Sequence, residues 1–453
     1  MNVGKEARMQ RISNWGKHPV INSDVVRFDN SNDLHEKIDI TGKIITYGNG
    51  RSYGDASLQK KVVSTNRYNS LKDFDLKNGI LKCESGVLLD DILSVFVPKG
   101  WFLPVSPGTK YITVGGAIAA DIHGKNHHQD GSFGKYVIEM DIMRSDGTII
   151  NCSRQKNSDF FNLTIGAMGL TGIILDVKIQ LHKIETAYVY QETKSFNNLD
   201  KIMDEFESQN NWKYSVAWID LFARNNNLGR GVFIKGRHAL KSELIDENFK
   251  INHLIKHKDS SLYLPFDLPS KFLNKFSGKL FNQIYYKLSY NKITSNIVHY
   301  DQFFYPLDKL RNWNRIYGSN GFTQYQLVLP KGIDRSVFKQ IIRIIQDADA
   351  CSYLAVLKLF GEQNDFMSFP MAGYTLSLDF PVSASIFLLL NKLDEIVIKH
   401  GGRLYLAKDV RMNKNTLLKT YKNANSFAEA ISMLNNGPSY HSSLLSTRLG
   451  ITS

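Results

Sequence analysis

The fold is decided by residues 106–134, SPGTKYITVGGAIAADIHGKNHHQDGSFG, which combine six glycines with small residues, three histidines and few bulky apolar side chains. Such a stretch does not build a core of its own. Its glycines let the main chain approach a ligand at points where a Cβ atom would clash. Because successive backbone N–H groups form an anion-binding concavity, the stretch predicts a cofactor-binding cradle, and a glycine-rich surface loop is the alternative.

A second glycine-rich stretch, YGNGRSYGD at 47–55, follows the apolar run KIIT at 43–46. This is the context in which a strand delivers a phosphate-binding turn. The spacing of Gly48, Gly50 and Gly54 is one residue too long for the dinucleotide fingerprint and no clear helix follows, so a Rossmann fold is disfavoured. Together the two stretches predict a pyrophosphate held by N–H groups of residues 48–54 and 115–118.

Several motifs carry a resemblance to a known family. They are GRSYGD (50–55), PGTKYITVGGAIAADIHGKNHH (107–128), GSFG (131–134), YSVAWID (214–220), WNRIYG (313–318), QYQLVLP (324–330), LKLFG (357–361) and YLAKD (405–409). The sequence resembles the FAD-dependent oxidases of the vanillyl-alcohol-oxidase type, and among them the decaprenylphosphoryl-ribose 2-oxidase family of cell-wall arabinan biosynthesis. The resemblance covers nearly the whole chain and implies an α+β, two-domain flavoprotein fold with a substrate-capping domain of antiparallel sheet and helices.

The length of 453 residues exceeds what one hydrophobic core usually serves, so two domains are expected. We assign residues 1–185 to an FAD-binding domain and 186–402 to a substrate-capping domain. The resemblance implies that 403–453 returns to the first domain and brings YLAKD onto the flavin. Apolar periodicity and end signals predict helices at 89–97, 199–208, 335–348 and 384–400, and DGT at 146–148 predicts a hairpin turn.

The formal charge of +13 predicts attraction to an anionic partner. No nucleic-acid-binding module is recognisable, so an anionic membrane surface or a phosphorylated lipid fits better. Cys83, Cys152 and Cys351 suggest neither a disulfide framework nor a zinc site. The polar amino terminus and the short apolar run at 385–390 predict neither a signal peptide nor a membrane span. We expect a cytoplasmic protein, with peripheral contact at the inner face of the cell membrane left open.

Between residues 250 and 300 the chain is rich in lysines and aromatic residues. The pattern runs through Phe272, Lys275, Phe276, Lys279, Leu280 and Phe281. Apolar and basic groups this close together are compatible with a helix that lies on an anionic membrane. An ordinary amphipathic helix packed on its own protein is the alternative, and the pattern alone slightly favours it.

The resemblance and the two glycine-rich stretches assign a set of cofactor contacts. These are Gly48, Asn49, Gly50, Arg51, Ser52, Tyr53, Gly54, Pro107, Gly108, Thr109, Gly115, Gly116, Ala117, Ile118, Gly124, His128, Ser132, Gly134, Gly172 and Ile174. Related aldonolactone and alditol oxidases carry a histidine near position 51, through which the flavin is covalently attached. Arginine does not form that bond, so non-covalent FAD is expected; a surface salt bridge is the alternative role of Arg51.

Lys408, His123 and Tyr405 are the predicted catalytic residues. Lys408 has apolar neighbours in YLAKD, and partial desolvation would lower its pKa and suit it to proton transfer. A solvated lysine at a strand end is the alternative. His123 lies within the predicted cradle, beside the flavin by resemblance. No metal is expected, because the adjacent His127 and His128 do not easily share a face and no carboxylate cluster accompanies them.

The predicted substrate contacts are Lys125, Trp218, Gln324, Gln326, Lys358, Thr375 and Ser377. Gln324 and Gln326 alternate and would share one face of a strand. Lys358 is a charge within an apolar run, which is costly unless it meets an anion. Mycobacterial members of the family have cysteine at the position of Ser377 and asparagine at that of Thr375, which puts the shape of the substrate site in doubt. Ordinary structural roles are the alternative for each.

The resemblance implies oxidation of a secondary sugar hydroxyl, at C2 of polyprenyl-phosphoryl-ribose, to the 2-keto form as the first half of an epimerisation. A separate keto-sugar reductase would complete the epimerisation, and quinone or another acceptor would reoxidise the flavin. One alternative is an aldonolactone or alditol oxidase that uses oxygen. An alternative of another class is a basic membrane-surface binding protein without a cofactor.

Overall fold

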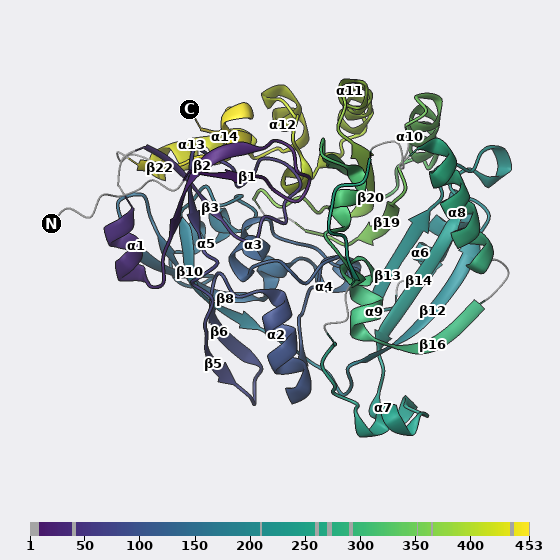
Figure 1. The fold of residues 1–453 in the computed structure, drawn as a ribbon, viewed down its shortest axis with the longest axis horizontal. Coiled ribbons are helices and arrows are strands. Elements are labelled where there is room, and N and C mark those ends of the chain that lie inside the picture. Colours follow the sequence, from purple (N-terminus) through teal and green to yellow (C-terminus); the bar gives the residue numbers. More distant parts are fainter. Residues whose placement is uncertain are drawn as a thin grey trace.

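The computed structural model describes residues 9–38, 42–208, 211–258, 262–269, 274–289, 293–350, 352–363, 366–434 and 439–452. Cys351 and Phe272 lie outside these ranges, so the predictions that involve them are not addressed. Three larger sheets organise the chain (Figure 1). Two five-stranded sheets belong mainly to its first 180 residues, and one eight-stranded sheet follows. No helix within the described ranges is long and apolar enough to cross a membrane.

The first sheet has the order β1-β2-β4-β3-β22. Its strands are β1 (Met9–Ile12), β2 (Ile21–Arg27), β4 (Lys61–Ser64), β3 (Gly42–Tyr47) and β22 (Ser439–His441). All its pairs are parallel except β1 with β2. Since β22 comes from the carboxyl-terminal segment and pairs with β3, the end of the chain lies beside the strand that leads into the first glycine-rich loop.

The second sheet is antiparallel, with the order β5-β6-β10-β8-β9. Its strands are β5 (Leu71–Asp75), β6 (Ile80–Glu84), β10 (Ile173–Gln180), β8 (Val137–Met143) and β9 (Ile149–Ser153). β8 and β9 form the predicted hairpin, with Gly147 at φ +82° in the turn. The neighbouring helices are α1 (Ser31–Lys37), α2 (Leu89–Phe96), α3 (Val114–Ala119), α4 (His127–Asp130) and α5 (Ser158–Thr164).

Helix α3 lies within the glycine-rich stretch 106–134 and was not predicted. Val114, Ala117 and Ile118 are fully buried and belong to the core around the second sheet. The stretch therefore builds no core of its own, but at these positions it contributes to the core that the second sheet forms. The small residues allow a six-residue helix to enter tightly packed surroundings, and Thr113 caps it by accepting a hydrogen bond from the Gly116 N–H.

The third sheet has the order β16-β12-β14-β13-β19-β20-β18-β21. Its strands are β16 (Ile293–His299), β12 (Tyr188–Phe196), β14 (Gly231–His238), β13 (Tyr214–Ile219), β19 (Ala355–Phe360), β20 (Gly373–Pro381), β18 (Phe322–Pro330) and β21 (Arg403–Leu404). Every pair in it is antiparallel. Its alternating side chains give it two faces of different character, one apolar and one turned to a cavity.

Three helices cover the apolar face of this sheet: α6 (Leu199–Ser208), α10 (Ser336–Asp347) and α11 (Ala384–Lys399) (Figure 1). They lie close to the helices predicted at 199–208, 335–348 and 384–400, as α2 does to the one predicted at 89–97. Asn198 accepts a hydrogen bond from the Lys201 N–H at 3.1 Å, as expected of a residue that precedes a helix.

After β21 the chain passes through the short 3-10 helix η8 (Leu406–Lys408) and then α12 (Lys414–Thr420), α13 (Ala424–Leu434) and α14 (Leu444–Arg448). This segment packs directly on the first glycine-rich loop. The Tyr53 N–H donates to the Ala407 carbonyl at 3.0 Å. The Arg448 guanidinium bridges Asp55 at 2.8 Å and Asp409 at 2.9 Å. The loop and YLAKD therefore form one structural unit.

Candidate active site

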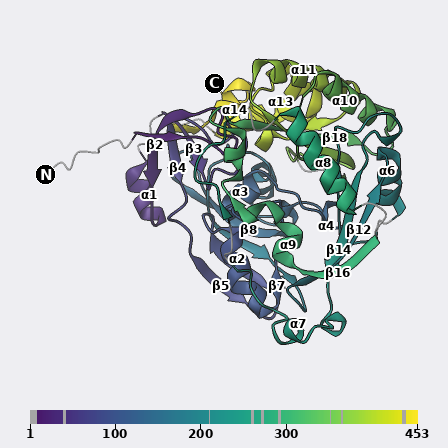
Figure 2. The ribbon, with the colours of Figure 1, turned by 45° about the vertical axis from the view of Figure 1, so that its right-hand side comes forward.

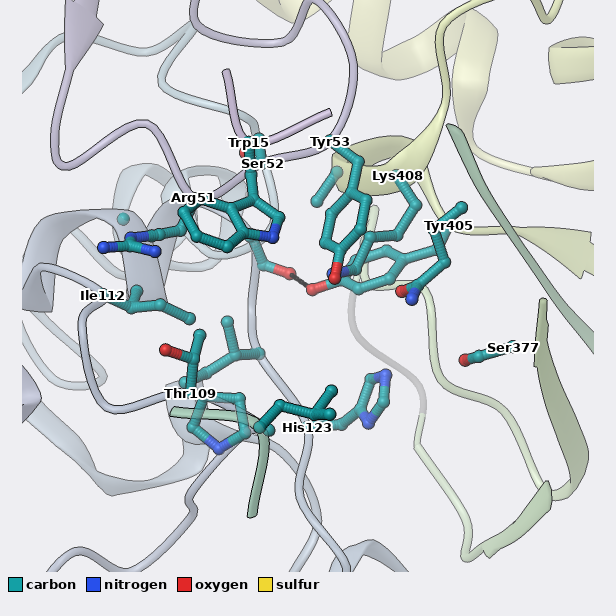
Figure 3. A pocket seen from close by; sticks show the side chains of 18 of the residues that line it. Trp15, Arg51, Ser52, Tyr53, Thr109, Ile112, His123, Ser377, Tyr405 and Lys408 are labelled. Carbon is teal, nitrogen blue, oxygen red and sulfur yellow. Dashed lines mark hydrogen bonds between the residues drawn. The ribbon is translucent and has the colours of Figure 1, made fainter. Parts of the chain in front are cut away.

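A cavity of about 720 Å³ lies where the two glycine-rich loops, the second face of the eight-stranded sheet and YLAKD meet (Figure 3). Its volume is within the range of cofactor and substrate sites. Most of the predicted residues line it. These are Gly48, Asn49, Gly50, Arg51, Ser52, Tyr53, Pro107, Gly108, Thr109, Gly115, Gly116, His123, Lys125, Gly172, Ile174, Trp218, Gln324, Gln326, Lys358, Ser377, Tyr405 and Lys408.

Eight predicted residues are not part of the cavity wall: Gly54, Ala117, Ile118, Gly124, His128, Ser132, Gly134 and Thr375. Their partners lie within the protein. His128 Nε2 lies 2.8 Å from the Trp212 carbonyl. The Ser132 hydroxyl and the Gly134 N–H donate to Asp121 at 2.6 and 2.8 Å. The cofactor and substrate contacts assigned to these eight residues therefore stay predictions, and the cavity lining does not support them.

The glycines are needed more for contacts within the chain than for contact with a ligand. A Cβ on Gly54 would lie 1.7 Å from the Asp409 carbonyl oxygen, and one on Gly48 would lie 2.5 Å from Thr113 Oγ1. Gly108 differs, because no protein atom lies within 4 Å of an added Cβ there. Among the described glycines of the two loops, Gly108 alone has bare backbone that borders open space in the way the sequence suggested.

The N–H groups of the second loop are also less available than predicted. The Gly115 N–H donates to the Ser85 carbonyl at 2.8 Å, and the Gly116 N–H donates to Thr113 Oγ1 at 3.2 Å. The Ala117 N–H donates to the Thr113 carbonyl at 2.8 Å. These groups already have acceptors in α3 and its surroundings. The prediction that residues 115–118 together supply donors to a pyrophosphate is therefore wrong for 115–117.

Arg51 provides a fixed positive charge at one end of the cavity (Figure 3). Its guanidinium carbon lies 4.2 Å from the centroid of the Trp15 ring and 5.3 Å from that of Tyr111. Burial lowers the pKa of this arginine, with nearby Asp308 acting in the opposite direction. Its Nε is buried and has no hydrogen-bond partner among the described residues. Such a donor fits the phosphate groups of FAD.

Lys408 lies at the other end of the cavity, beside Tyr53 (Figure 3). Its Nζ is 3.7 Å from the centroid of the Tyr53 ring, a cation–π geometry. Burial and the positive charge of Lys358 lower the pKa of Lys408 to about 7, while Asp379 acts to raise it. The amine therefore changes protonation state close to neutral pH, which is the property required of a general base.

Asp379 is a functional candidate that was not predicted from the sequence. It is fully buried on β20, and burial raises its pKa to about 7. One carboxylate oxygen accepts from the Gln324 amide at 2.6 Å, and the other has no partner among the described residues. Its signal in GYTLSLDFP was a carboxylate two residues beyond Ser377, on the same face of an otherwise apolar strand.

His123 is held in its neutral form. The Gln326 amide nitrogen lies 2.9 Å from His123 Nε2, and since an amide nitrogen only donates, Nε2 is the acceptor. Burial lowers the pKa of His123 well below its usual value, and Lys358, His127 and Lys408 add to this effect. The proton is therefore on Nδ1, which is buried without a partner among the described residues. It is a second donor available to a bound cofactor.

Two further lysines, both partly buried, line the cavity. Lys125 Nζ donates to the Phe303 carbonyl and lies 4.4 Å from the centroid of that ring. Burial lowers the pKa of Lys125 to about 7 and that of Lys358 to about 8. Since an anion nearby would favour their charged forms, both residues suit a phosphorylated substrate.

Tyr405 and the substrate-side polar residues are also fixed by the protein. The Tyr405 hydroxyl donates to the Ala120 carbonyl at 2.9 Å, and its ring stacks on Phe369 at 4.6 Å. This positions the ring at the wall but leaves its hydroxyl engaged. Thr375 Oγ1 accepts a hydrogen bond from the Gln326 amide at 3.1 Å and thereby fixes the orientation of that amide. Ser377 lies on the wall opposite Gln326 in the β18–β20 register.

Within the described ranges, no group of three or more histidine, cysteine, aspartate or glutamate side chains has the arrangement of a metal site. His127 Nε2 lies 2.6 Å from Gln363 Oε1, and its Nδ1 accepts from the Gly361 N–H. The cavity fits FAD better, because it combines buried donors without partners at Arg51 and His123 with open backbone at Gly108.

Comparison with known proteins agrees with this reading of the cavity. A family profile described as FAD binding domain matches residues 25–153. The decaprenylphosphoryl-beta-D-ribose oxidase of Mycolicibacterium smegmatis is 36% identical over 384 residues, covering 83% of this chain and 83% of that protein. An uncharacterised protein of Streptomyces coelicolor is 28% identical over 81% of this chain and 100% of its own length. The L-gulonolactone oxidase of Mus musculus is 27% identical over 36% of this chain and 38% of that protein.

Proposed function

The chain belongs to the decaprenylphosphoryl-β-D-ribose oxidase family of FAD-dependent oxidoreductases, and on this premise we propose that it oxidises the C2 hydroxyl of a polyprenyl-phosphate-linked ribose. The observation that carries the proposal is the convergence of Arg51, the second glycine-rich loop and Lys408 on one cavity. These elements are far apart in the sequence. One cavity therefore offers both an anion-binding end and a titratable end with a lysine whose pKa is near 7.

Lys408 acts as the general base for the substrate hydroxyl in the proposed reaction. Above about pH 7 its amine is mostly neutral, so Nζ accepts the proton of the substrate hydroxyl as the carbonyl forms. FAD, when bound, would supply the two-electron oxidant for this oxidation. Asp379 stabilises the resulting ammonium, because its negative charge acts to raise the pKa of Lys408.

The partly buried lysines account for the phosphorylated part of the substrate. Lys125 and Lys358 are partly buried in the cavity wall, and desolvation lowers the pKa of both. A phosphate diester supplies the missing negative charge. Gln324 and Gln326 offer amide groups from the same face of β18 and suit sugar hydroxyls.

Arg51 supports non-covalent FAD. By the resemblance, aldonolactone and alditol oxidases carry near this position the histidine that bonds to the flavin. The contacts of Arg51 with Trp15 and Tyr111 suit it to electrostatic binding instead. The 2-keto product requires a separate keto-sugar reductase if the overall change is an epimerisation. Quinone or another acceptor must take the electrons from the reduced cofactor.

Anaerobic bleaching of the enzyme-bound FAD tests the proposal. Decaprenylphosphoryl-ribose is expected to bleach the flavin absorption band in a single turnover, whereas L-gulonolactone and xylitol at the same concentration are expected to leave it unchanged. Bleaching by the soluble sugars but not by the lipid-linked one would refute the proposed substrate. It would instead assign the chain to the aldonolactone or alditol oxidases.

A further inference from the structure

Helix α8 (Lys275–Ser289) has an inverted amphipathic arrangement. Its outward side chains include Phe276, Leu280, Ile284 and Leu288, with exposed fractions of 80%, 52%, 50% and 72%. They recur every four residues and form a stripe along the helix. Its buried residues are Gly278, Asn282 and Tyr286. A surface helix normally turns its apolar stripe toward the core, so this orientation requires a reason.

The inward face of α8 fixes this orientation. A Cβ on Gly278 would lie 2.7 Å from the rings of Phe222 and Tyr353, so no larger residue fits there without rearrangement. The Asn282 amide donates to Asp220 at 3.1 Å, and Tyr286 packs with Trp218. Rotating the helix to hide its apolar stripe would break all these contacts.

Charge accompanies the exposed stripe. Lys279 and Lys287 lie on the helix among the apolar side chains, and Lys275 at its start pairs with Asp349. The helix contains no acidic residue, and the chain as a whole carries a formal charge of +13. We call Phe276, Lys279, Leu280, Ile284, Lys287 and Leu288 the α8 surface. Apolar side chains flanked by lysines match the boundary between the headgroups and acyl chains of an anionic bilayer.

The helix that carries the α8 surface also borders the cavity. Phe281 and Tyr285, on the same helix, line the cavity together with Leu307 and Lys309. The β15 strand (Leu262–Tyr263) pairs with β17 (Leu310–Arg311) just beyond these residues, and its side chains are also exposed. Figure 2 shows α8 on the near side of the molecule.

We propose that the α8 surface docks on an anionic lipid bilayer and places the cavity mouth against it. A polyprenyl chain could then remain in the bilayer while its phosphate and sugar reach Lys125 and Lys358 past Phe281 and Tyr285. The use of docking for substrate entry rests on the proposed function. The docking itself rests only on the orientation of α8 and its charge.

Vesicle flotation of the full-length, FAD-loaded protein tests the proposal. The probes are vesicles of phosphatidylcholine mixed with phosphatidylglycerol, and vesicles of phosphatidylcholine alone. The wild type is expected to float with the anionic vesicles and about tenfold less with the neutral ones. The double variant Leu280→Gln/Ile284→Gln and the double variant Lys279→Gln/Lys287→Gln should each lose about tenfold of the anionic binding.

The matched control is Leu388→Gln/Met433→Gln, because these side chains are 64% and 71% exposed but lie on α11 and α13. It should float like the wild type. All variants should keep the flavin content and melting temperature of the wild type, since the changed side chains face outward. Equal loss in the control, or no flotation of the wild type, would overturn the proposal. So would gel filtration that shows a dimer dispersed by Leu280→Gln/Ile284→Gln without any vesicle binding.

The two proposals fail independently. If the substrate were wrong, decaprenylphosphoryl-ribose would not bleach the flavin in detergent, yet flotation would still depend on the α8 surface. If docking were wrong, bleaching in detergent would persist in all variants while flotation failed.

Discussion

Replacing Lys408 by methionine removes the titratable amine but keeps an unbranched side chain over the Tyr53 ring. In the wild type, a pKa of about 7 means that the neutral amine makes up ~9% of Lys408 at pH 6 and ~91% at pH 8. If the neutral amine is the base, the rate of flavin reduction should rise about tenfold between these pH values. In Lys408→Met the rate should fall by about 10²–10⁴ and lose this rise.

The assay is anaerobic stopped-flow reduction of the bound FAD by decaprenylphosphoryl-ribose across pH 5.5–9. Flavin content and melting temperature control for loss of structure, and the variant should bind FAD normally because Lys408 is not needed for the anion-binding end of the cavity. A variant that reduces its flavin within about twofold of the wild-type rate would refute the role of Lys408 as base. A pH profile that keeps its midpoint near 7 in Lys408→Met would assign the titration to another group, such as Asp379 or Lys358.

Three further predictions concern the surroundings of this lysine. Asp379→Asn removes the charge that acts to raise the pKa of Lys408, so the midpoint of the pH profile should move about one unit or more toward acid; an unchanged or higher midpoint would contradict this coupling. Gly54→Ala places a methyl group 1.7 Å from the Asp409 carbonyl oxygen and should cost about 1–3 kcal/mol of unfolding free energy in a thermal or denaturant melt. Gly108→Ala, which meets no protein atom, is its control and should melt like the wild type when both proteins are measured without FAD. Ser377→Cys puts a thiol on the cavity wall, so mass spectrometry should find a maleimide adduct at this position that decaprenylphosphoryl-ribose suppresses; labelling that the substrate does not slow would place Ser377 outside the substrate site.

The helices that pack on the eight-stranded sheet were predictable because their apolar periodicity is strong. Helices α6 and α11 begin and end within one residue of the predicted ranges, since Asn198 precedes one and Gly401 follows the other. Helix α3 was not predictable in this way. Its sequence, VGGAIA, contains two glycines and two β-branched residues and has low intrinsic helix propensity, so tertiary packing of Val114 and Ile118 must stabilise it.

The residues of the candidate site also differ in how strongly the local sequence marks them. Residues in unusual local sequence, such as Arg51 and Lys408, were found because glycine-rich loops and the YLAKD motif stand out. Asp379 was missed because a single carboxylate two residues beyond Ser377 is only a weak local signal. Its importance arises only from the β18–β20 register, which places it opposite Gln324, and from the separate segment that brings Lys408 near it.

Helix α8 shows that the same periodicity can have opposite meanings. Its sequence indicates an amphipathic helix, and the usual rule would turn Phe276 and Leu280 toward the core. In the structure the apolar face of α8 points outward instead. Only a glycine fits against Phe222 and Tyr353, and Asn282 has its hydrogen-bond partner in Asp220. The shape and polarity of the surface beneath α8 therefore determine which face of the helix is exposed. This orientation leaves an exposed apolar and basic stripe on a helix that borders a cavity lined with partly buried lysines, an arrangement that suits lipid-linked phosphates.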